Sequence, residues 1–434
     1  MYRLRWWIAG VIARFYTLGI FTKVEIIGEV DTSRPTLFVA NHFGGFVDAI
    51  VVVRALGGLP HIVAKSTLFE RLPLRLILKM LGVVPVYRRA DTADQSKNRG
   101  SFDEVAAVLA KGRSVLIFPE GTVTDTQELQ TIRTGAARMA LTAIAQGTDD
   151  LRVAPVGITY EDKVSSRSRV LVEIGEPLTA ADIIDISAGS PIDPENRDLV
   201  ATITEEIRSR LAAVAPDYGS YIRERTMMLA ASIHLRTVMT TAFVEPSMAA
   251  LRKAAQHLGN ATRNDDRALP ATADYQLALA GCGLEDHQIQ PRATVGRLAR
   301  LSVRKAIIII VISPLALFGL VANIIPILLI LAVGAVIKEP VSKGTARVLA
   351  GIVLFPISWA LLISFNDFEY VWFTVVLLFL GVILLVIAVG QVFDLFEAAT
   401  GWWAVRNHLG LLPELRALRS EAEGELASLV GEPN

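Results

Sequence analysis

The chain has very little cysteine, since Cys282 is the only one in 434 residues. A single thiol excludes an intramolecular disulfide, a thiolate zinc cluster and a Cys-x-x-Cys redox motif. Most of the histidines are scattered without the spacing of metal ligands, namely His61, His234, His257, His287 and His408. We therefore expect no metal and no other bound cofactor.

The chain also lacks an excess of charge, because 43 basic residues balance 43 acidic residues. This balance argues against nucleic acid as a partner. Hydrophobic residues make up 52% of the chain. A chain of this length is too long for one ordinary domain, and this hydrophobic content predicts that part of it lies in a bilayer.

The N-terminal residues 1–23 contain an apolar stretch with arginines on either side, and Arg14 interrupts it. No small-residue cleavage site follows, so a signal peptide is a poor interpretation. The tryptophans and phenylalanines between basic residues predict a helix that lies in the membrane interface. A core helix packed on a sheet is an equally good interpretation of the pattern.

Residues 24–215 alternate short β-rich runs with helical patterns. We predict strands at 24–27, 36–40, 61–64, 83–87, 114–118, 152–158 and 169–174, and helices at 72–81, 101–110 and 134–146. This alternation is typical of an α/β domain with a mostly parallel, seven-stranded sheet and crossover helices.

The rest of the chain is predicted to be helical. Residues 216–304 read as a helical connector, residues 305–390 as transmembrane hairpins, and residues 391–434 as a cytoplasmic acidic tail. The apolar run 306–337 is too long for a single upright crossing of about 30 Å. We expect a break near Asn323 and Pro326, giving a re-entrant hairpin or two short helices. Residues 348–365 and 371–390 read as clearer spans.

The clearest chemical motif is Asn41-His42-Phe43-Gly44-Gly45-Phe46-Val47-Asp48, directly after the predicted strand 36–40. Open α/β sheets place their chemistry at such strand ends. His42 takes a proton from a hydroxyl near neutral pH, and Asp48 on the other ring nitrogen would orient it. Because residues six apart lie on different faces of a helix, the chain must turn between them. Alternatively, these residues only cap a strand, a turn and a helix.

Basic side chains follow the next strands. Arg88 and Arg89 end the predicted strand 83–87, and Lys65 ends the strand before it. A guanidinium group binds phosphate with a planar fork, so this placement suits a phosphorylated substrate. A solvated surface pair is the alternative interpretation.

A third motif, Phe118-Pro119-Glu120-Gly121-Thr122, follows the strand that begins at 114. Glu120 offers a carboxylate to substrate hydroxyls, and Gly121 lets the backbone approach a ligand closely. The alternative is a Pro-Gly turn with an exposed glutamate. A fourth stretch, Val153-Ala154-Pro155-Val156, is a buried strand that contains a proline.

In this order, the four motifs resemble those of the glycerolipid acyltransferase family, which includes lysophosphatidate and glycerol-3-phosphate acyltransferases. The resemblance covers residues 24 to about 180. It implies that His42 is the general base, Asp48 orients it, Arg88 holds the acceptor phosphate, and Glu120 with Gly121 and Thr122 forms the acceptor site. The co-substrate would be an acyl thioester of coenzyme A or acyl carrier protein.

Two features depart from the usual family pattern. Five residues separate His42 from Asp48 where four are usual, which looks like the yeast-type glycerol-3-phosphate acyltransferases, whose catalytic domain is also followed by membrane helices. Val123 stands where the family usually has an arginine. Arg133 or Arg89 would then supply the second phosphate contact.

The function that follows is a membrane-bound O-acyltransferase acting on glycerol 3-phosphate or 1-acylglycerol 3-phosphate. No nucleophilic serine follows His42, which fits direct attack by the acceptor hydroxyl on the thioester. The alternatives are an acyltransferase or transacylase acting on other lysophospholipids, a catalytically weak lipid-binding membrane protein, an esterase or thioesterase, and a transporter.

The charges beside the apolar runs predict an orientation. Both ends of the run 306–337 are basic, and the segment between the last two spans carries Asp367 and Glu369. Since basic flanks favour the cytoplasmic side, we expect an integral membrane protein whose catalytic domain lies on the cytoplasmic face.

Overall fold

The computed structural model describes residues 2–29, 31–43, 45–70, 72–87, 96–121, 129–162, 168–187, 191–238, 246–262, 269–289, 295–336, 340–364 and 370–430. The chain forms two compact units. The first comprises residues 1–14, 24–160 and 170–219, and the second comprises residues 15–23, 161–169 and 220–434.

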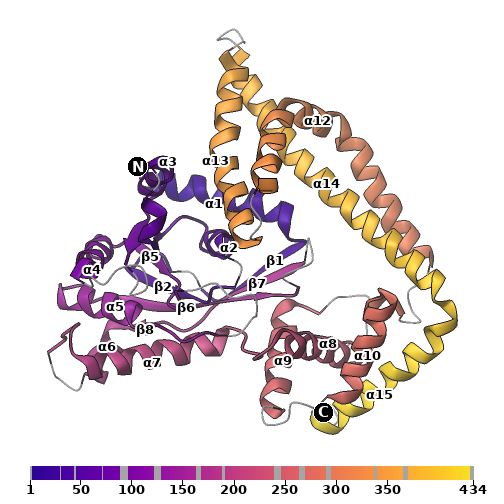
Figure 1. Cartoon of the computed structure of the whole chain (residues 1–434), viewed down its shortest axis with the longest axis horizontal. Helices are drawn as coiled ribbons and strands as arrows, with labels where there is room; N and C mark the ends of the chain where they lie inside the picture. The colour runs from indigo at the N-terminus through magenta and orange to yellow at the C-terminus, as the bar shows by residue number, and fades with distance from the viewer. Residues whose placement is uncertain are drawn as a thin grey trace. The chain divides into compact units, whose positions relative to one another are not determined.

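The first unit is built on one mixed sheet (Figure 1), with the strand order β1-β7-β6-β2-β5-β3-β4 and with β8 beside β6. Strands β4, β3, β5, β2 and β6 are parallel, and β7 and β8 run antiparallel to β6. The strands are β1 (Lys23–Ile27), β2 (Thr36–Ala40), β3 (His61–Lys65), β4 (Val84–Val86), β5 (Ser114–Ile117), β6 (Arg152–Tyr160), β7 (Arg169–Ile174) and β8 (Leu178–Thr179). The predicted mostly parallel α/β sheet is confirmed. Its strand number is corrected from seven to eight, because the two-residue β8 is too short to leave a pattern in the sequence.

Helices cover both faces of this sheet, which is why the central strand β2 is buried at every position and is apolar after Thr36. One face carries α4 (Ser96–Leu109), α5 (Gly135–Ala145) and α7 (Arg197–Val214), whose side chains share a core with Leu37 and Val39. The other carries α1 (Tyr2–Ile20) and α2 (Phe46–Leu56) (Figure 1). The remaining helices of the unit are η1 (Ser66–Phe69), α3 (Leu72–Met80) and α6 (Ala180–Ile186).

The α1 residues that belong to the first unit have two different faces. Ala13 packs with Val53 and Leu59 in a small core. Gly10 lies so close to Gly57 that a Cβ there would come within 2.3 Å of the Gly57 carbonyl oxygen, which excludes a larger residue. The opposite face exposes large apolar side chains, namely Leu4, Trp7, Ile8 and Ile12. The helix therefore has a packed face and an exposed apolar face, and its location in a membrane interface stays a prediction.

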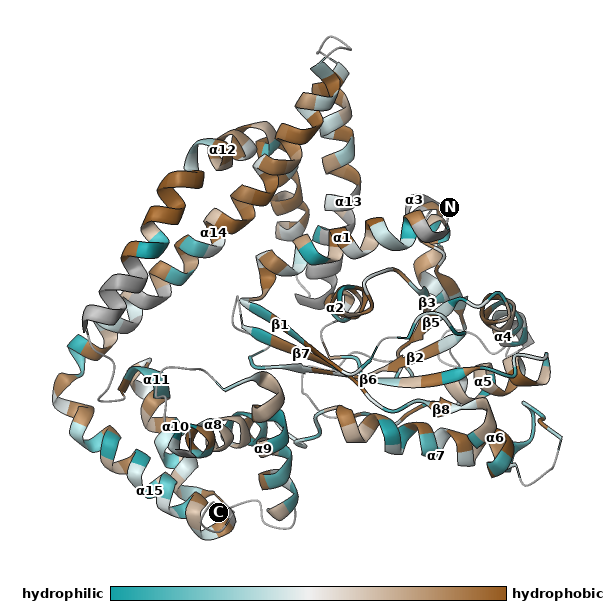
Figure 2. Ribbon diagram, turned by 180° about the vertical axis from the view of Figure 1, so that it is seen from behind, coloured by the Kyte–Doolittle hydropathy of each residue, from teal (hydrophilic) through white to brown (hydrophobic). Residues whose placement is uncertain are grey.

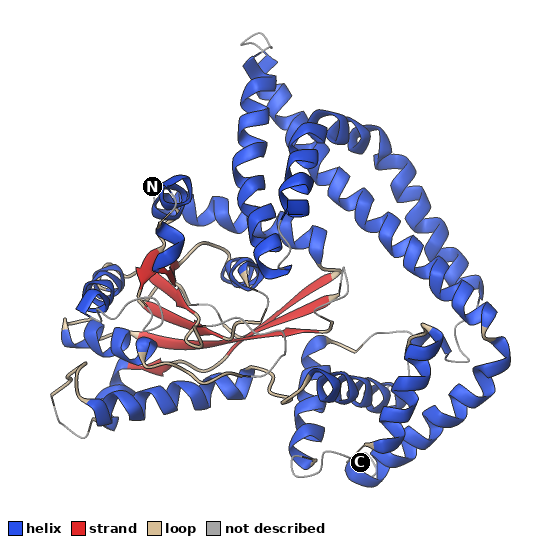
Figure 3. Ribbon diagram, in the orientation of Figure 1, coloured by secondary structure: helices blue, strands red, loops and turns tan. Residues whose placement is uncertain are grey.

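The second unit combines a helical bundle with three long helices (Figure 3). The bundle contains α8 (Tyr221–Val238), α9 (Met248–Ala261), α10 (Pro270–Cys282), α11 (Asp286–Ile289) and α15 (Leu412–Val430), the last preceded by η3 (Leu409–Leu411). The long helices are α12 (Val295–Val336), α13 (Pro340–Ser364) and α14 (Val371–Asn407).

The predicted acidic tail, residues 391–434, contains α15, and acidic side chains of this helix hold it in the bundle. The Glu425 carboxylate accepts hydrogen bonds from the backbone N–H groups of Ala271 and Thr272, both at 3.0 Å, and so caps the start of α10. Arg419 donates to the buried Asp286 at 2.7 Å. Charge on α15 is therefore used in packing, and residues 391–407 belong to α14.

The predicted break near Asn323 and Pro326 is wrong, because α12 is one helix that contains both Pro314 and Pro326. It nevertheless bends sharply partway along (Figure 1). Its first part lies on α14, where Gly319 meets the backbone of Gly381, and its second part lies on α13, where Asn323 accepts a hydrogen bond from Trp359 Nε1 at 2.7 Å. A proline removes one backbone hydrogen bond and crowds the preceding turn, which bends a helix without ending it.

Two described helical segments are long and apolar enough to cross a membrane, Val303–Val336 and Val371–Phe396. Figure 2 shows the hydrophobic colour along α12 and α14. About four fifths of the side chains in their most apolar windows are not buried within the protein, since only 22% and 17% of the windows are buried. Exposed apolar surfaces of this kind are typical of sites that contact a membrane or another protein.

Candidate active site

His42 and Asp48 lie in contact at the carboxyl edge of the parallel strands. His42 follows β2 by one residue, and Asp48 lies in the first turn of α2. His42 Nδ1 donates to Asp48 Oδ2 at 2.9 Å. The turn that joins them uses Gly45 with a φ of 66°, which favours glycine. This contact fixes the Nδ1–H tautomer and leaves Nε2 with its lone pair for a proton.

The His42 ring is held on two sides. Its face stacks on the Phe118 ring with the centroids 4.1 Å apart. The preceding residue, Asn41, is fully buried and grips β6, since its Nδ2 donates to the Ile158 carbonyl at 3.0 Å and its Oδ1 accepts from the Ile158 N–H at 2.7 Å. The backbone pairing of β2 with β6 ends at Ala40, so the Asn41 amide extends it by one step. His42 is thereby anchored at the end of the strand.

Asp48 has partners on both oxygens and no exposure to solvent. While Oδ2 accepts from His42, Oδ1 accepts from the Tyr160 hydroxyl at 2.5 Å. Tyr160 is the last residue of β6 and is itself buried. Burial raises the pKa of this phenol well above its usual value, so the hydroxyl keeps its proton as a donor.

Glu120 lies beside this pair after β5. Its Oε1 accepts from the His42 backbone N–H at 3.2 Å, and its Oε2 is buried without a hydrogen-bond partner among the described residues. Burial, with a smaller contribution from the Asp48 charge, raises the pKa of Glu120 to about 7. Such a carboxyl group can exchange a proton near neutral pH, and its second oxygen is available for a ligand hydroxyl.

Gly121 and Arg133 form the other side of the Glu120 loop. Gly121 has a φ of 67°, and a Cβ there would come within 2.9 Å of Arg133 Nε. Arg133 Nε donates to the Glu120 carbonyl at 3.1 Å, and the side chain is otherwise exposed. The structure therefore brings Arg133 to the Glu120 loop, where its outer nitrogens point to no described acceptor.

The predicted basic residues are distributed along the same edge. Since β2, β5, β3 and β4 are neighbours in that order, Lys65 at the end of β3 lies two strands from the strand that carries His42. Arg88 and Arg89 follow β4 and, like Thr122, lie outside the described residues. Adjacent strands are about 4.8 Å apart, so Lys65 is displaced from His42 by about 10 Å along the edge.

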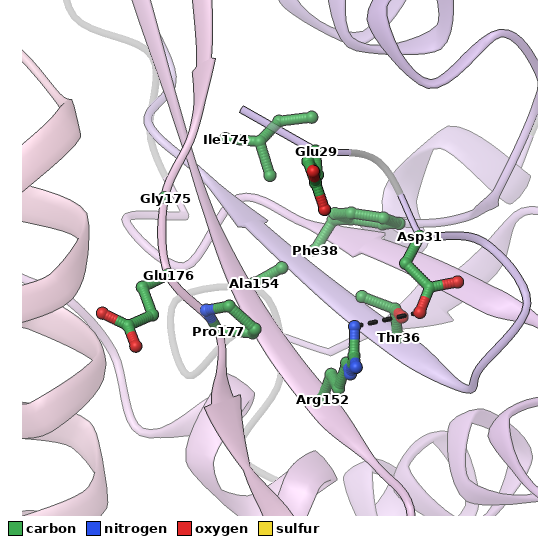
Figure 4. Close-up of a pocket in the computed structure, with 10 residues that line it drawn as sticks. All are labelled: Glu29, Asp31, Thr36, Phe38, Arg152, Ala154, Ile174, Gly175, Glu176 and Pro177. Carbon is green, nitrogen blue, oxygen red and sulfur yellow. Dashed lines mark hydrogen bonds and ion pairs between the residues drawn. The ribbon is translucent and has the colours of Figure 1, made fainter. Parts of the chain in front are cut away.

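A cavity of about 450 Å³ lies at the opposite end of the sheet, with Glu29, Asp31, Thr36, Phe38, Arg152, Ala154, Ile174, Gly175, Glu176 and Pro177 in its walls (Figure 4). Arg152 forms an ion pair with Asp31 at 3.0 Å. Thr36 begins the strand that His42 follows, and six residues of extended chain span about 20 Å. This cavity is therefore separate from the His42 site.

Two site residues escaped the sequence analysis. Asn41 was interpreted only as a turn residue, and Tyr160 was not considered. Both depend on β6 lying beside β2, a neighbourhood between residues over 110 positions apart. An aromatic hydroxyl at the end of a buried strand was the available signal for Tyr160, because such a hydroxyl needs a partner.

Comparison with known proteins relates part of this chain to a known family. Residues 22–159 match the sequence model of the acyltransferase family. The chain is 27% identical over 303 residues to glycerol-3-phosphate O-acyltransferase 2 of Saccharomyces cerevisiae, which covers 67% of this chain and 39% of that protein. It is 30% identical over 158 residues to the lyso-ornithine lipid O-acyltransferase of Rhizobium meliloti, covering 36% of this chain and 51% of the relative.

The chain thus spans only about two fifths to one half of the length of these relatives. Among solved structures, it is similar to the 1-acyl-sn-glycerophosphate acyltransferase PlsC of Thermotoga maritima, with a TM-score of 0.32 and 18% identity over 47% of this chain and 78% of that one. The matched segment contains the whole His42, Asp48 and Glu120 arrangement. Residues 22–159 of this chain therefore match the acyltransferase family.

Proposed function

We propose that this chain is a membrane-bound O-acyltransferase of glycerolipid synthesis. It would move a fatty acyl group from acyl-coenzyme A or acyl carrier protein to a hydroxyl of glycerol 3-phosphate or 1-acylglycerol 3-phosphate. The observation that carries this proposal is the contact of 2.9 Å between His42 Nδ1 and the buried Asp48 carboxylate, within the segment that matches the family.

In the proposed reaction, His42 acts as the general base. Its Nε2 takes the proton of the acceptor hydroxyl while the hydroxyl oxygen attacks the thioester carbonyl carbon. Asp48 stabilises the imidazolium that forms. As the C–S bond breaks, the electron pair leaves with sulfur, and the thiolate can recover the proton from His42. A thiolate is a good leaving group, so this sequence needs no acyl-enzyme intermediate.

Glu120 would position the acceptor. Its Oε1 accepts a hydrogen bond from the His42 backbone N–H, whereas its buried Oε2 has no hydrogen-bond partner among the described residues. A hydroxyl held on Oε2 would be close to His42, which converts a bimolecular encounter into a positioned one. Lys65, Arg88 and Arg133 are our candidates for the acceptor phosphate, because they follow neighbouring strands or the Glu120 loop.

The membrane assignment rests on exposed apolar surface in both units. In the first unit, the exposed face of α1 is accompanied by the exposed Leu76 and Met80 of α3, with Arg75 and Lys79 exposed beside them. Apolar side chains next to cationic ones favour an anionic bilayer surface. In the second unit, α12 and α14 supply the two long apolar helices.

An acyl-transfer assay tests the proposed activity. The full chain, in native membranes or purified in detergent, is given radiolabelled acyl-coenzyme A or acyl carrier protein with glycerol 3-phosphate, 1-acylglycerol 3-phosphate, or a lysophospholipid that lacks a terminal phosphate. We expect transfer to at least one of the first two. Release of free fatty acid with every acceptor would instead identify a thioesterase, and transfer only to the third would exclude the phosphate-recognition part of the proposal.

Orientation can be tested separately. With Cys282 replaced by Ser, a single cysteine at the exposed Lys111 of the first unit should react with an impermeant thiol reagent only after the cells are permeabilised. Labelling in intact cells would contradict a cytoplasmic catalytic domain.

A further inference from the structure

Tyr160 reaches the site from a different element than the other residues. It ends β6, which lies beside β2, whereas His42 follows β2 and Asp48 belongs to α2. Its ring is only 3% exposed, and its hydroxyl donates to Asp48 Oδ1 at 2.5 Å. The phenol thus donates to Asp48 Oδ1, while His42 donates to Oδ2.

Asp48 is fully buried, so its carboxylate relies on hydrogen-bond donors, and His42 and Tyr160 are two of them. A buried carboxylate without donors is costly and tends to take up a proton. The backbone contact of Asp48, from its own N–H to the Gly45 carbonyl, does not stabilise the carboxylate. A donor on Oδ1 therefore shares the negative charge and fixes the rotation of the carboxylate toward His42.

We propose that Tyr160 is a positioning residue of this site, which holds the Asp48 carboxylate on His42 and sets how readily the pair takes up a proton. This inference rests on the proposed function, because it assigns a role in the same site. The phenol does not touch the substrate. It acts through Asp48.

Polar groups from several elements surround the pair of His42 and Asp48. Tyr160 comes from β6 and Glu120 from the loop after β5, while Arg133 reaches the same loop through the Glu120 carbonyl. Phe118 covers one face of the imidazole. Of these, Tyr160 is the neutral donor on Asp48, so its removal changes the proton affinity of the pair without changing any formal charge.

The direction of that change follows from the protonation states. The working form of the pair holds His42 neutral and Asp48 ionised, and the inactive form holds one more proton. Replacing the phenol with phenylalanine destabilises the working form most, because the negative charge on Asp48 then loses the Tyr160 donor. The pair therefore takes up its extra proton more readily, and the fall of activity on the acidic side of the pH profile moves to higher pH.

The test compares Tyr160→Phe with Thr159→Val in the full chain. Thr159 is the preceding residue on β6 and is 1% exposed, and its hydroxyl has no hydrogen-bond partner in the part of the chain that the structure describes. Both variants delete one buried hydroxyl from the same strand, but only the first deletes a contact with Asp48. A purely structural effect would lower the rate at every pH and leave the acidic side of the pH–rate profile at the same pH.

Two readouts are measured against pH. One is kcat/KM for acyl transfer. The other is the rate at which diethyl pyrocarbonate modifies His42, followed by peptide mass spectrometry, which reports proton uptake without turnover. We expect the acidic limb of both readouts to move to higher pH in Tyr160→Phe and to stay unchanged in Thr159→Val.

A folded Tyr160→Phe protein whose labelling curve coincides with the wild type would overturn the role of Tyr160. If no acceptor supports transfer in the wild type, the proposed function fails, while the labelling curves still decide this inference. Should Tyr160→Phe not fold, 3-fluorotyrosine incorporated at position 160 replaces it. A more acidic phenol is a stronger donor, so the limb must then move to lower pH, and an unmoved limb would again contradict the inference.

Discussion

The Asn41→Ala substitution removes a polar clamp on which the catalytic strand end depends. In the wild type, the Asn41 amide pairs with both the N–H and the C=O of Ile158, at 2.7 and 3.0 Å. Ile158 is fully buried and lies two residues beyond Val156, the last β6 residue in register with β2. Alanine would leave both backbone groups of Ile158 unpaired in the interior.

The expected cost follows from these two groups. A buried backbone donor or acceptor that loses its partner costs about 1–3 kcal/mol. Two such groups give about 2–6 kcal/mol, and we take about 3–4 kcal/mol because a water molecule entering the vacated space would partly satisfy them. Since each 1.4 kcal/mol is a tenfold change in an equilibrium, local opening of β2 and β6 should become roughly 100- to 1,000-fold more frequent.

Hydrogen exchange of the full chain in detergent measures this opening, through peptides that cover residues 36–42 and 152–160. The control is Asn196→Ala, which removes an exposed side chain that caps α7 through the N–H groups of Asp198 and Leu199. Loss of such a cap costs about 1 kcal/mol. The two variants are compared by the increase in hydrogen-exchange rate, measured in β2 and β6 for Asn41→Ala and in α7 for Asn196→Ala. If the increase in β2 and β6 were no larger than that in α7, the Asn41 amide would not hold the end of β2.

Three further predictions concern separate parts of the chain. The pKa of Glu120 rises from 4.5 to about 7 in the folded protein, so the native state binds this proton more tightly than the unfolded chain. The free energy of unfolding should therefore fall by about 3 kcal/mol as the pH rises from about 4.5 to 7. Denaturation at pH 5 and pH 8 should show a smaller fall in Glu120→Gln than in the wild type, and an equal fall would contradict the assignment. Glu425→Gln weakens the capping of α10 by about 1–2 kcal/mol and should speed proteolysis of α15. Glu421→Gln, which changes an exposed side chain of the same helix, should not speed it. Equal rates of proteolysis in the two variants would mean that the Glu425 contact does not hold α15 in the bundle. Gly381→Leu forces a side chain into the backbone of α12, which lies 2.8 Å from a Cβ at this position, and should lower the thermal stability of the second unit in detergent. The control Gly424→Ala meets open space and should leave this stability unchanged. An unchanged unfolding transition in Gly381→Leu would show that α12 and α14 do not pack closely.

The sequence predicted the sheet well because its strands are buried on both faces. The continuous apolar run Thr36–Ala40 and its counterparts need no partner information to be recognised as strands. Motifs at strand ends then located His42, Asp48 and Glu120, since parallel strands present their carboxyl ends at one edge. Local pattern was sufficient to recognise the strands and to find three residues that the structure brings together, whereas their catalytic roles stay predictions.

Contacts that depend on strand order could not be predicted in this way. Tyr160 and Asn41 meet their partners only because β6 lies beside β2, and no periodicity in the sequence encodes that neighbourhood. The bend in α12 was misjudged for a different reason. Pro326 reads as a helix end in the sequence, but a proline inside a long helix can bend the helix without ending it.

The central claim is that His42 is the base that activates the acceptor hydroxyl. It is tested most directly by acyl transfer to the preferred phosphorylated acceptor in His42→Ala, compared with the wild type at equal amounts of folded protein. General-base catalysis contributes about 100- to 10,000-fold, so we predict a fall of at least about 100-fold at saturating substrates. A His42→Ala protein that is folded and transfers acyl groups within a few-fold of the wild-type rate would contradict the account.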